Sequence, residues 1–189
     1  GGVRMIRRFG HWLVALLACA AMIGLHAYTG EFGHVDARRA TIGQTARLYA
    51  STVVVNGWSI GQVLYSDDAF VGRTGVIYLV VNVTVATDGS ERSTSWKVGG
   101  ESNGRTFAVD DPLFVPEPGF QRRQDVVFEL SPDDLAGFTV TFLDQAPIYA
   151  YDPQVNVDLG ITAQDAAQAF DRSRYDTVRT TSGTVEVIR

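Results

Sequence analysis

The sequence has few of the residues that carry nucleophilic and metal chemistry. It contains one cysteine and three histidines in 189 residues, and all four lie within the first 34 positions. Without imidazole, the rest of the chain has no general base for Ser-His-Asp or Cys-His catalysis. Zinc, copper and haem sites draw on the same two residue types, and no glycine-rich phosphate loop is present. We therefore predict a non-enzyme with no catalytic residue, no cofactor and no metal ligand.

Positive charge is also scarce. The 16 basic residues include a single lysine, Lys97, and they face 21 acidic residues, which gives a net charge of −5. A nucleic-acid-binding protein needs a basic face that neutralises phosphates, so no nucleic-acid partner is expected. The preference for arginine is typical of a GC-rich bacterial genome. With 46% hydrophobic residues and no biased stretch, the chain is long enough for one domain with a real core.

A long uncharged run lies within the first thirty residues. The stretch from Trp12 to Leu25 carries no charge, and its uncharged flanks extend it to residues 9–28. A helix of that length spans roughly 30 Å, the thickness of the hydrocarbon core of a bilayer. Three arginines precede the run, and the positive-inside rule therefore places the N-terminus in the cytoplasm. We expect residues 1–30 to form a cytoplasmic stub and one transmembrane signal-anchor helix, with the rest of the chain outside the cell membrane.

Three alternatives compete with an uncleaved anchor. A signal peptide cleaved after Ala27 would have Leu25 at position −3, where a small residue is preferred. A lipoprotein signal ending at Cys19 would have too short an apolar run before the cysteine. The pair Arg7-Arg8 is typical of twin-arginine export signals, but two adjacent arginines are weak evidence. The anchor is favoured, and whether the leader is cleaved stays open.

Beyond a polar juxtamembrane linker at residues 31–44, the pattern is that of short strands. Residues 76–85 (VIYLVVNVTV) are rich in β-branched types and alternate in their second half. Further strands are expected at 53–55, 58–64, 93–98, 106–109, 125–130, 138–143 and within 148–159. Seven or more short strands with no helix between them predict a mainly β fold, an antiparallel immunoglobulin-like β-sandwich over residues 45–160.

Turn residues and a short helix complete the predicted organisation. Asn56-Gly57 and Asp88-Gly89 are expected to be turns, and Gly99-Gly100 and Asn103-Gly104 are expected to bracket a loop before the strand at 106–109. Residues 161–189 are expected to form a short helix and a C-terminal tail. The helix would run from Thr162 to about Arg172, with Thr162 and Asp165 as a capping pair. Residues 177–188 are either a last strand or a frayed tail. Whether residues 146–189 complete the sandwich or dock on a partner stays open.

Carboxylates and aromatic rings are the remaining candidates for chemistry. Paired acids can cleave glycosides or bind calcium, and the chain has the doublets Asp67-Asp68, Asp110-Asp111 and Asp133-Asp134. Each doublet lies beside turn residues, where aspartate bonds its own backbone, so a turn role is favoured. Arg122-Arg123 is interpreted as a solvated strand start. Five aromatic residues are interpreted as core or loop residues, with no small-molecule ligand expected: Trp58, Trp96, Phe107, Phe114 and Phe120.

The order of several motifs is similar to that of a known family. Residues 41–44 (TIGQ) are followed by the valines at 53–55, residues 75–83 (GVIYLVVNV), Pro118-Gly119 and residues 125–130 (DVVFEL). Over roughly residues 41–145 this order resembles the telokin-like, immunoglobulin-type sandwich domains of exported Gram-positive, including actinobacterial, proteins, many of unknown function. The resemblance implies an extracytoplasmic interaction module and assigns no catalytic residue.

These features together predict an anchored accessory protein. All 21 acidic residues but only 13 of the 16 basic ones follow residue 30, so the exported part carries about −8. Anionic lipid headgroups repel such a surface. We expect a non-catalytic subunit of a bacterial cell-envelope membrane complex, in contact with the lipid bilayer through its helix and with other membrane-protein subunits. The alternative is an extracytoplasmic binding protein for a small molecule, an envelope polymer or calcium.

Overall fold

The computed structural model describes residues 19–21, 36–88, 95–109, 111–143, 153–173 and 176–188. The chain divides into two compact units, Gly1–Val35 and Asp36–Arg189. In the first unit only residues 19–21 are described, and they are helical. None of the helices in the described part of the chain has the length and apolar character needed to cross a membrane. The rest of the predicted anchor lies outside the described residues.

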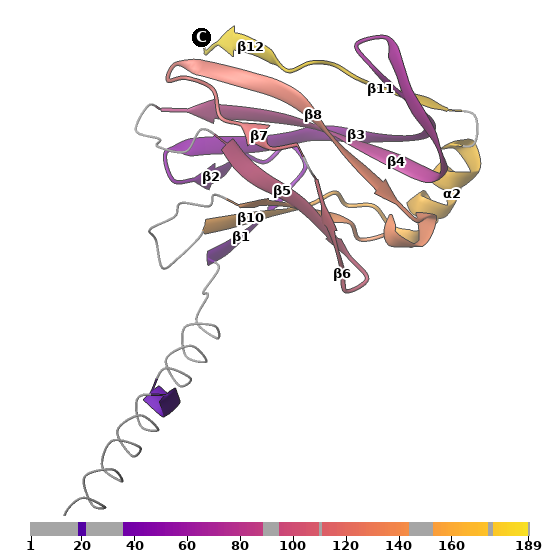
Figure 1. Ribbon diagram of the computed structural model, residues 1–189, viewed down its shortest axis with the longest axis horizontal. Helices are drawn as coiled ribbons and strands as arrows, with labels where there is room; N and C mark the ends of the chain where they lie inside the picture. Colours follow the sequence, from indigo (N-terminus) through magenta and orange to yellow (C-terminus); the bar gives the residue numbers. More distant parts are fainter. Residues whose placement is uncertain are drawn as a thin grey trace, which may run out of the picture. The chain divides into compact units, whose positions relative to one another are not determined.

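The second unit consists of two β-sheets that share one core, which confirms the predicted mainly β fold (Figure 1). The first sheet has the order β1-β10-β9-β5-β6, with β7 beside β5. Its strands are β1 (Asp36–Thr41), β5 (Ser95–Ser102), β6 (Arg105–Ala108), β7 (Leu113–Phe114), β9 (Thr139–Leu143) and β10 (Pro153–Asp158).

The second sheet has the order β11-β3-β4-β8-β12, with β2 beside β3. Its strands are β2 (Ala46–Leu48), β3 (Ser51–Ser66), β4 (Ala69–Thr87), β8 (Phe120–Leu130), β11 (Thr177–Thr180) and β12 (Thr184–Val187). Two helices connect strands, the 3-10 helix η1 (Pro132–Asp134) and α2 (Ala163–Ser173).

Strand β4 shows how the alternating sequence builds the core. From residue 77 to residue 85 every second side chain is fully buried between the sheets, and the intervening ones face outward. Val140 and Phe142 of β9 are equally buried on the facing sheet. Each such side chain contributes about 1.5–3 kcal/mol by leaving water, so this row is the main apolar support of the fold.

Two edge strands pair in parallel, which the expectation of a purely antiparallel sandwich missed. β11 runs parallel to β3, and β1 runs parallel to β10 from Asp36↔Pro153 to Thr41↔Asp158. Strand β1 occupies six residues of the segment 31–44, which was predicted to be a linker. That prediction was wrong for these residues. An edge strand is held by backbone hydrogen bonds, so among residues 37–41 only Ala40 is buried and no apolar alternation marks them.

The Asn56-Gly57 pair, predicted to be a turn, lies inside the continuous strand β3. The pairing of β3 with β4 skips one residue between Val55 and Gly57, so Asn56 is the extra residue of a β-bulge. Its Nδ2 atom donates hydrogen bonds to Asn82 Oδ1 and Thr84 Oγ1 on β4, both at 2.8 Å. The dipeptide therefore bends the strand and leaves the chain direction unchanged.

Gly99-Gly100 is likewise inside a strand, so the loop predicted over residues 99–104 is only the turn at Asn103-Gly104. Both glycines pair with β6 and with β9 as part of β5. Asn103 and Gly104 have φ angles of 49° and 71° and connect β5 to β6, as a two-residue hairpin requires. The predicted Asp88-Gly89 turn falls at the end of the described range 36–88, and Gly89 lies outside it.

The hairpin of β3 and β4 extends beyond β8 and covers the outer face of the second sheet. Its tip is Asp67-Asp68, with φ angles of 46° and 64°. We call residues 62–73 the hairpin arm; it lies beside β11 in Figure 1. Leu64 of the arm and Val178 of β11 pack with Val80 in a small second core. The arm therefore shields apolar side chains that an open sheet would leave in water.

The C-terminal residues belong to the sandwich. The predicted helix is confirmed as α2. Its capping pair is formed by Thr162, which donates from Oγ1 to Asp165 Oδ2 at 2.6 Å and accepts from the Asp165 amide at 3.1 Å. Hydrogen bonds from Thr162 lower the pKa of Asp165. Strands β11 and β12 then add to opposite ends of the second sheet, so residues 177–187 form strands in place of a frayed tail.

Replacement of Gly100 by alanine tests the packing of the core. A Cβ at this position would lie 2.2 Å from Cζ of the fully buried Phe138 ring. We expect Gly100→Ala to lower the free energy of unfolding by about 1–3 kcal/mol, measured by urea unfolding of the full-length protein. Gly75→Ala is the matched control, because Gly75 is an exposed β4 residue whose added Cβ would meet no atom within 4 Å. Equal unfolding midpoints for both variants would contradict this account.

Candidate functional site

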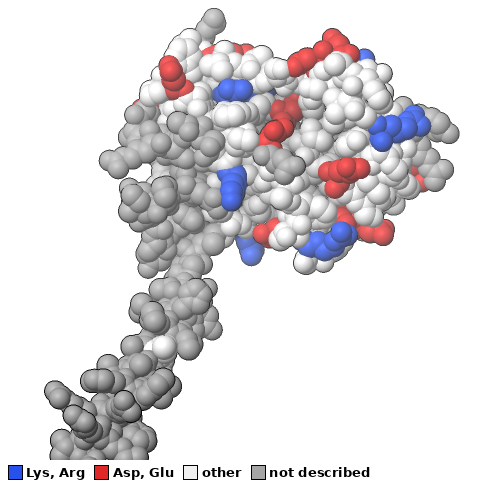
Figure 2. Space-filling view, viewed as in Figure 1, with Lys and Arg blue, Asp and Glu red and all other residues white. Residues whose placement is uncertain are grey.

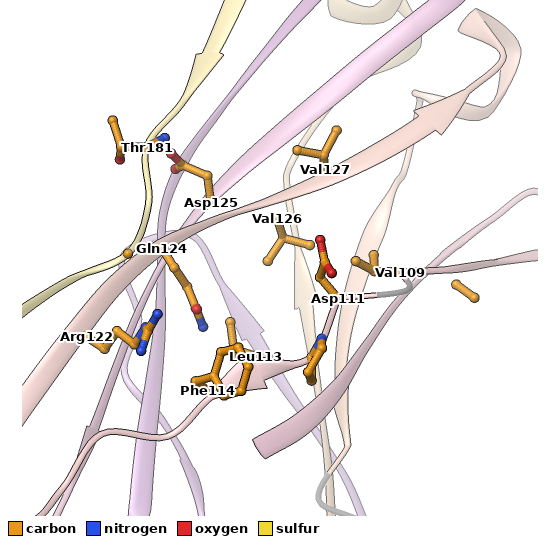
Figure 3. A pocket seen from close by; sticks show the side chains of 13 residues that line it. Val109, Asp111, Leu113, Phe114, Arg122, Gln124, Asp125, Val126, Val127 and Thr181 are labelled. Carbon is orange, nitrogen blue, oxygen red and sulfur yellow. Dashed lines mark hydrogen bonds between the residues drawn. The ribbon is translucent and has the colours of Figure 1, made fainter. Parts of the chain in front are cut away.

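A pocket of about 470 Å³ lies between β7 and β8, at one end of the sandwich. It is lined by the segment that leads into β7, by the first half of β8 and by the connection between β11 and β12 (Figure 3). The volume falls within the range of small-molecule sites in proteins. The side chains on β8 decide what the pocket can bind.

The inward-facing side chains of β8 are apolar in the core and polar where the strand lines the pocket. Phe128 and Val126 are buried in the core, and the next two inward positions are Gln124 and Arg122. These two residues pair with Val83 and Val85 of β4, and opposite residues in antiparallel strands face the same side of the sheet. Figure 3 shows both side chains pointing toward β7. A polar pair thus stands where the core pattern would place aliphatic residues.

Both polar side chains have buried donors that no described residue satisfies. Gln124 is 9% exposed, and its Nε2 atom has no hydrogen-bond partner. Arg122 Nε is also buried and without a partner. Trp96 Nε1, in the core, is the other such atom in the described part of the chain. Buried donors in native proteins are almost always paired, so two of these three unpaired atoms mark the pocket as unusual.

The guanidinium of Arg122 is held between an aromatic ring and a glycine. Its Cζ lies 5.2 Å from the ring centroid of Phe114 on β7, which stays 45% exposed. On the C-terminal segment, a Cβ at Gly183 would lie 2.8 Å from Arg122 Nε. Only glycine therefore fits beside the guanidinium without a shift. The cation is fixed in place while the face of the Phe114 ring remains accessible.

Two acids also line the pocket, and one of them, Asp125, accepts hydrogen bonds from described residues. Asp125 points away from Arg122 (Figure 3) and accepts from Asn82 Nδ2 at 2.7 Å and from the Thr181 amide at 3.1 Å. Asp111 lies at the mouth of the pocket with an exposed side chain. The lining thus carries one cation and two carboxylates.

The C-terminal segment that borders the pocket is fastened by the tip of the hairpin arm. Asp67 Oδ1 accepts from the Ser182 amide at 2.8 Å, and Asp67 Oδ2 accepts from the Ser182 hydroxyl. Asp68 forms an ion pair with Arg179. We call these contacts the clasp. The two hydrogen bonds from Ser182 lower the pKa of Asp67, because they stabilise its ionised form.

The three acidic doublets have structural positions rather than a common site. Asp67-Asp68 forms the hairpin tip, which confirms its turn role. Asp134 lies in η1, is 3% exposed and pairs through Oδ2 with Arg105 Nη1 at 2.6 Å. Asp110 lies outside the described residues, and its neighbour Asp111 reaches the pocket. Nowhere in the described ranges do three or more His, Cys, Asp or Glu side chains form a metal-binding group.

The predicted aromatic and arginine residues divide between core and pocket. Trp96 is buried, and Trp58 and Phe107 are partly buried against the core, as expected. Phe114 lines the pocket, which its interpretation as a loop or core residue did not foresee. Arg123 is exposed as predicted, but Arg122 faces inward, so its interpretation as a solvated strand start was wrong. The signal was present in the sequence, because position 122 is in phase with the core positions 126, 128 and 130.

An open sheet edge lies next to the pocket. Strand β12 pairs with β8 only from Phe120 to Arg123, and among the described strands none continues this pairing along residues 124–130. Val185 and Val187 of β12 are 53% and 63% exposed. An edge of this kind presents unpaired backbone donors and acceptors beside apolar side chains. On the face seen in Figure 2, acidic and basic side chains are interspersed and neither sign dominates.

The clasp makes the C-terminal segment sensitive to acid. Because folding lowers the pKa of Asp67 below its ordinary value of 3.8, the two hydrogen bonds from Ser182 to Asp67 are fully formed above that pH. They are lost as the pH falls through the lower, folded-state value. We expect the Ser182 amide resonance of the full-length protein to titrate below pH 3.8 in NMR spectra.

The variant Asp67→Asn should remove this titration and accelerate exchange of the Ser182 amide at neutral pH. Asparagine tolerates the positive φ of the tip, so the turn itself is retained. Asp171→Asn, on the exposed surface of α2, is the control with the same change of charge. A Ser182 amide that titrates identically in Asp67→Asn and in the native protein would contradict the clasp.

Comparisons with known proteins place no family on this chain. No family model matches the sequence, and no curated protein is significantly similar to it. The crystal structure of the yjhA protein from Bacillus subtilis is similar over 63% of this chain and 99% of its own, with 14% sequence identity and a TM-score of 0.41. A likeness at this level assigns neither a family nor a ligand.

Proposed function

We propose that the protein is an extracytoplasmic protein-interaction module, tethered to the cell membrane by one helix within residues 1–30. Its N-terminus would lie in the cytoplasm, and it would act as a non-catalytic accessory subunit of a bacterial cell-envelope membrane complex. The tether rests on the uncharged run at residues 9–28 and the arginines before it. The sandwich from residue 36 onward supplies the interaction surface.

The observation that carries the interaction is the apolar edge at β12. Val185 and Val187 are each more than half exposed. They belong to β12, which among the described strands pairs with β8 alone. An extended segment of a partner protein can pair with such an edge through its backbone and cover the valines with its side chains. Exposed apolar edge strands otherwise promote aggregation, so a resident partner would also protect the protein.

The proposal includes the telokin-like, immunoglobulin-type character of the sandwich. Its support is the order of the motifs between residues 41 and 130, together with the two-sheet arrangement in which those motifs form β3, β4 and β8. Domains of this type serve mainly as interaction modules, which agrees with the absence of a histidine or cysteine from the sequence after position 34.

A second candidate function is the binding of a small molecule at the pocket between β7 and β8. The unpaired donors of Arg122 and Gln124 favour it. This function and the first are compatible, since neither Val185 nor Val187 of β12 is among the described residues that line the pocket.

The interaction can be tested by extraction of the native membrane with mild detergent, followed by native gel electrophoresis and mass spectrometry. We expect the protein to migrate with defined membrane subunits and with its leader intact. Val187→Glu should reduce the recovery of those subunits about tenfold or more, which corresponds to about 1.4 kcal/mol of binding. The reason is that the change puts a charge on the apolar edge.

Val71→Glu is the matched control, because Val71 is an equally exposed valine on the hairpin arm. It should leave the recovery unchanged. Migration of the native protein alone, or its appearance in the soluble fraction without the leader, would contradict the proposal. An equal loss of subunits in both variants would show that β12 is not the interface.

A further inference from the structure

We infer that the pocket between β7 and β8 binds a carboxylate group, with Arg122 and Gln124 as its hydrogen-bond donors. This site goes beyond the proposed protein interaction and does not depend on it, because its donors are on β8 and the described lining includes neither Val185 nor Val187 of β12. Four features support it: the unpaired donors, the charge of the lining, the rigid placement of the guanidinium, and the shape of the space.

The unpaired donors define the chemistry of the missing group. Arg122 Nε and Gln124 Nε2 are both buried and both lack an acceptor among the described residues, and they belong to two residues that line the pocket. Gln124 is more than nine-tenths buried, so bulk water does not replace the absent partner. Arginine cannot act as an acceptor. A bound group that satisfies it must therefore offer oxygen lone pairs.

The donors of Arg122 favour an acceptor with one negative charge. Among the described lining residues Arg122 is the one cation, and Asp111 and Asp125 are the two acids. Phosphate carries nearly two charges and would face more repulsion from these acids than a carboxylate does. A neutral carbonyl would form weaker hydrogen bonds with the guanidinium than a carboxylate. A carboxylate matches both the single cation and the forked geometry of arginine donors.

The position of the guanidinium is fixed before any ligand binds. Arg122 Cζ lies 5.2 Å from the ring centroid of Phe114, and Gly183 leaves no room for a side chain beside Arg122 Nε. A donor held in this way loses little conformational entropy on binding. Because the Phe114 ring remains 45% exposed beside the charge, it offers an apolar surface to whatever is attached to the carboxylate.

The space is larger than a carboxylate needs. A volume of about 470 Å³ accommodates a group of the size of an aromatic amino acid attached to the acid. Two sources supply such chemistry, a free small organic acid and the C-terminal end of a polypeptide. Both present a carboxylate next to an apolar body, and suitable probes can distinguish them.

The test uses the full-length protein and four probes: phenylacetate as a free acid, N-acetyl-phenylalanine as a polypeptide end, N-acetyl-phenylalanine amide, and inorganic phosphate. Binding is followed by calorimetry and by the NMR signals of the Arg122 Nε–H and Gln124 side-chain amide groups. We expect the two carboxylates to shift both signals. The amide should bind about tenfold more weakly or worse, since charged hydrogen bonds are the stronger ones. Phosphate should bind about as weakly as the amide, since its second negative charge is repelled by Asp111 and Asp125.

The relative affinity of the two acids then identifies the source. Tighter binding of N-acetyl-phenylalanine indicates a polypeptide end, and tighter binding of phenylacetate indicates a free acid. Both results support the site. The proposal is overturned if neither acid binds at about 10 mM, or if the amide or phosphate binds as well as the acids.

Variants of adjacent residues separate the pocket from general charge effects. Arg122→Met should weaken carboxylate binding about tenfold or more, whereas Arg123→Met removes the same charge from an exposed neighbour and should leave it within about twofold. Gln124→Leu removes the second donor at similar volume, and thermal melting verifies that each variant is folded. If Arg122→Met does not fold, the carboxylate affinity of Gln124→Leu is compared with that of Gln121→Leu, the outward control. Equal effects of the inward and outward variants would overturn the site.

Discussion

The register between β4 and β8 is the constraint on which the core and the pocket both depend. Leu130 pairs with Ile77 at one end and Arg122 with Val85 near the other, so one alignment decides every inward side chain of β8. A shift by one residue would turn Arg123 and Asp125 toward the core and expose Phe128. The cost of burying those charges makes the observed register unambiguous. The strand that completes the core also places Arg122 and Gln124 at its end.

The C-terminal segment links parts of the chain that are distant in sequence. Ser182 contacts Asp67 across 115 positions, and Thr181 contacts Asp125 on β8. These bonds bring Gly183 against Arg122, so the wall of the pocket depends on the tip of the hairpin arm. The arm in turn covers Val80 on the outer face of the sheet. Packing on one face of the second sheet thus positions a polar group on the other.

Local sequence signals predicted the elements that rely on local chemistry. The valine alternation identified β4, the pair Thr162 and Asp165 identified the start of α2, and Asn103-Gly104 identified its turn. Elements that depend on distant partners were missed. β1 has no apolar pattern because its ladder to β10 is made of backbone groups, and the bulge at Asn56 exists only in register with β4. The alternation of apolar residues in β8 places residue 122 on the inward face. Arginine is rarely buried, however, so its residue type led to the prediction of a solvent-exposed side chain.

The polar residues at the end of β8 make the core less stable than aliphatic residues would, which is consistent with a binding role. Aliphatic residues at positions 122 and 124 would extend the buried row of Phe128 and Val126 and leave no donor unpaired, which favours stability. The chain instead holds an arginine between Phe114 and Gly183. Beside it, residues 124–130 of β8 have no described strand along one edge. An extended polypeptide that paired with this edge would bring its own end toward the guanidinium.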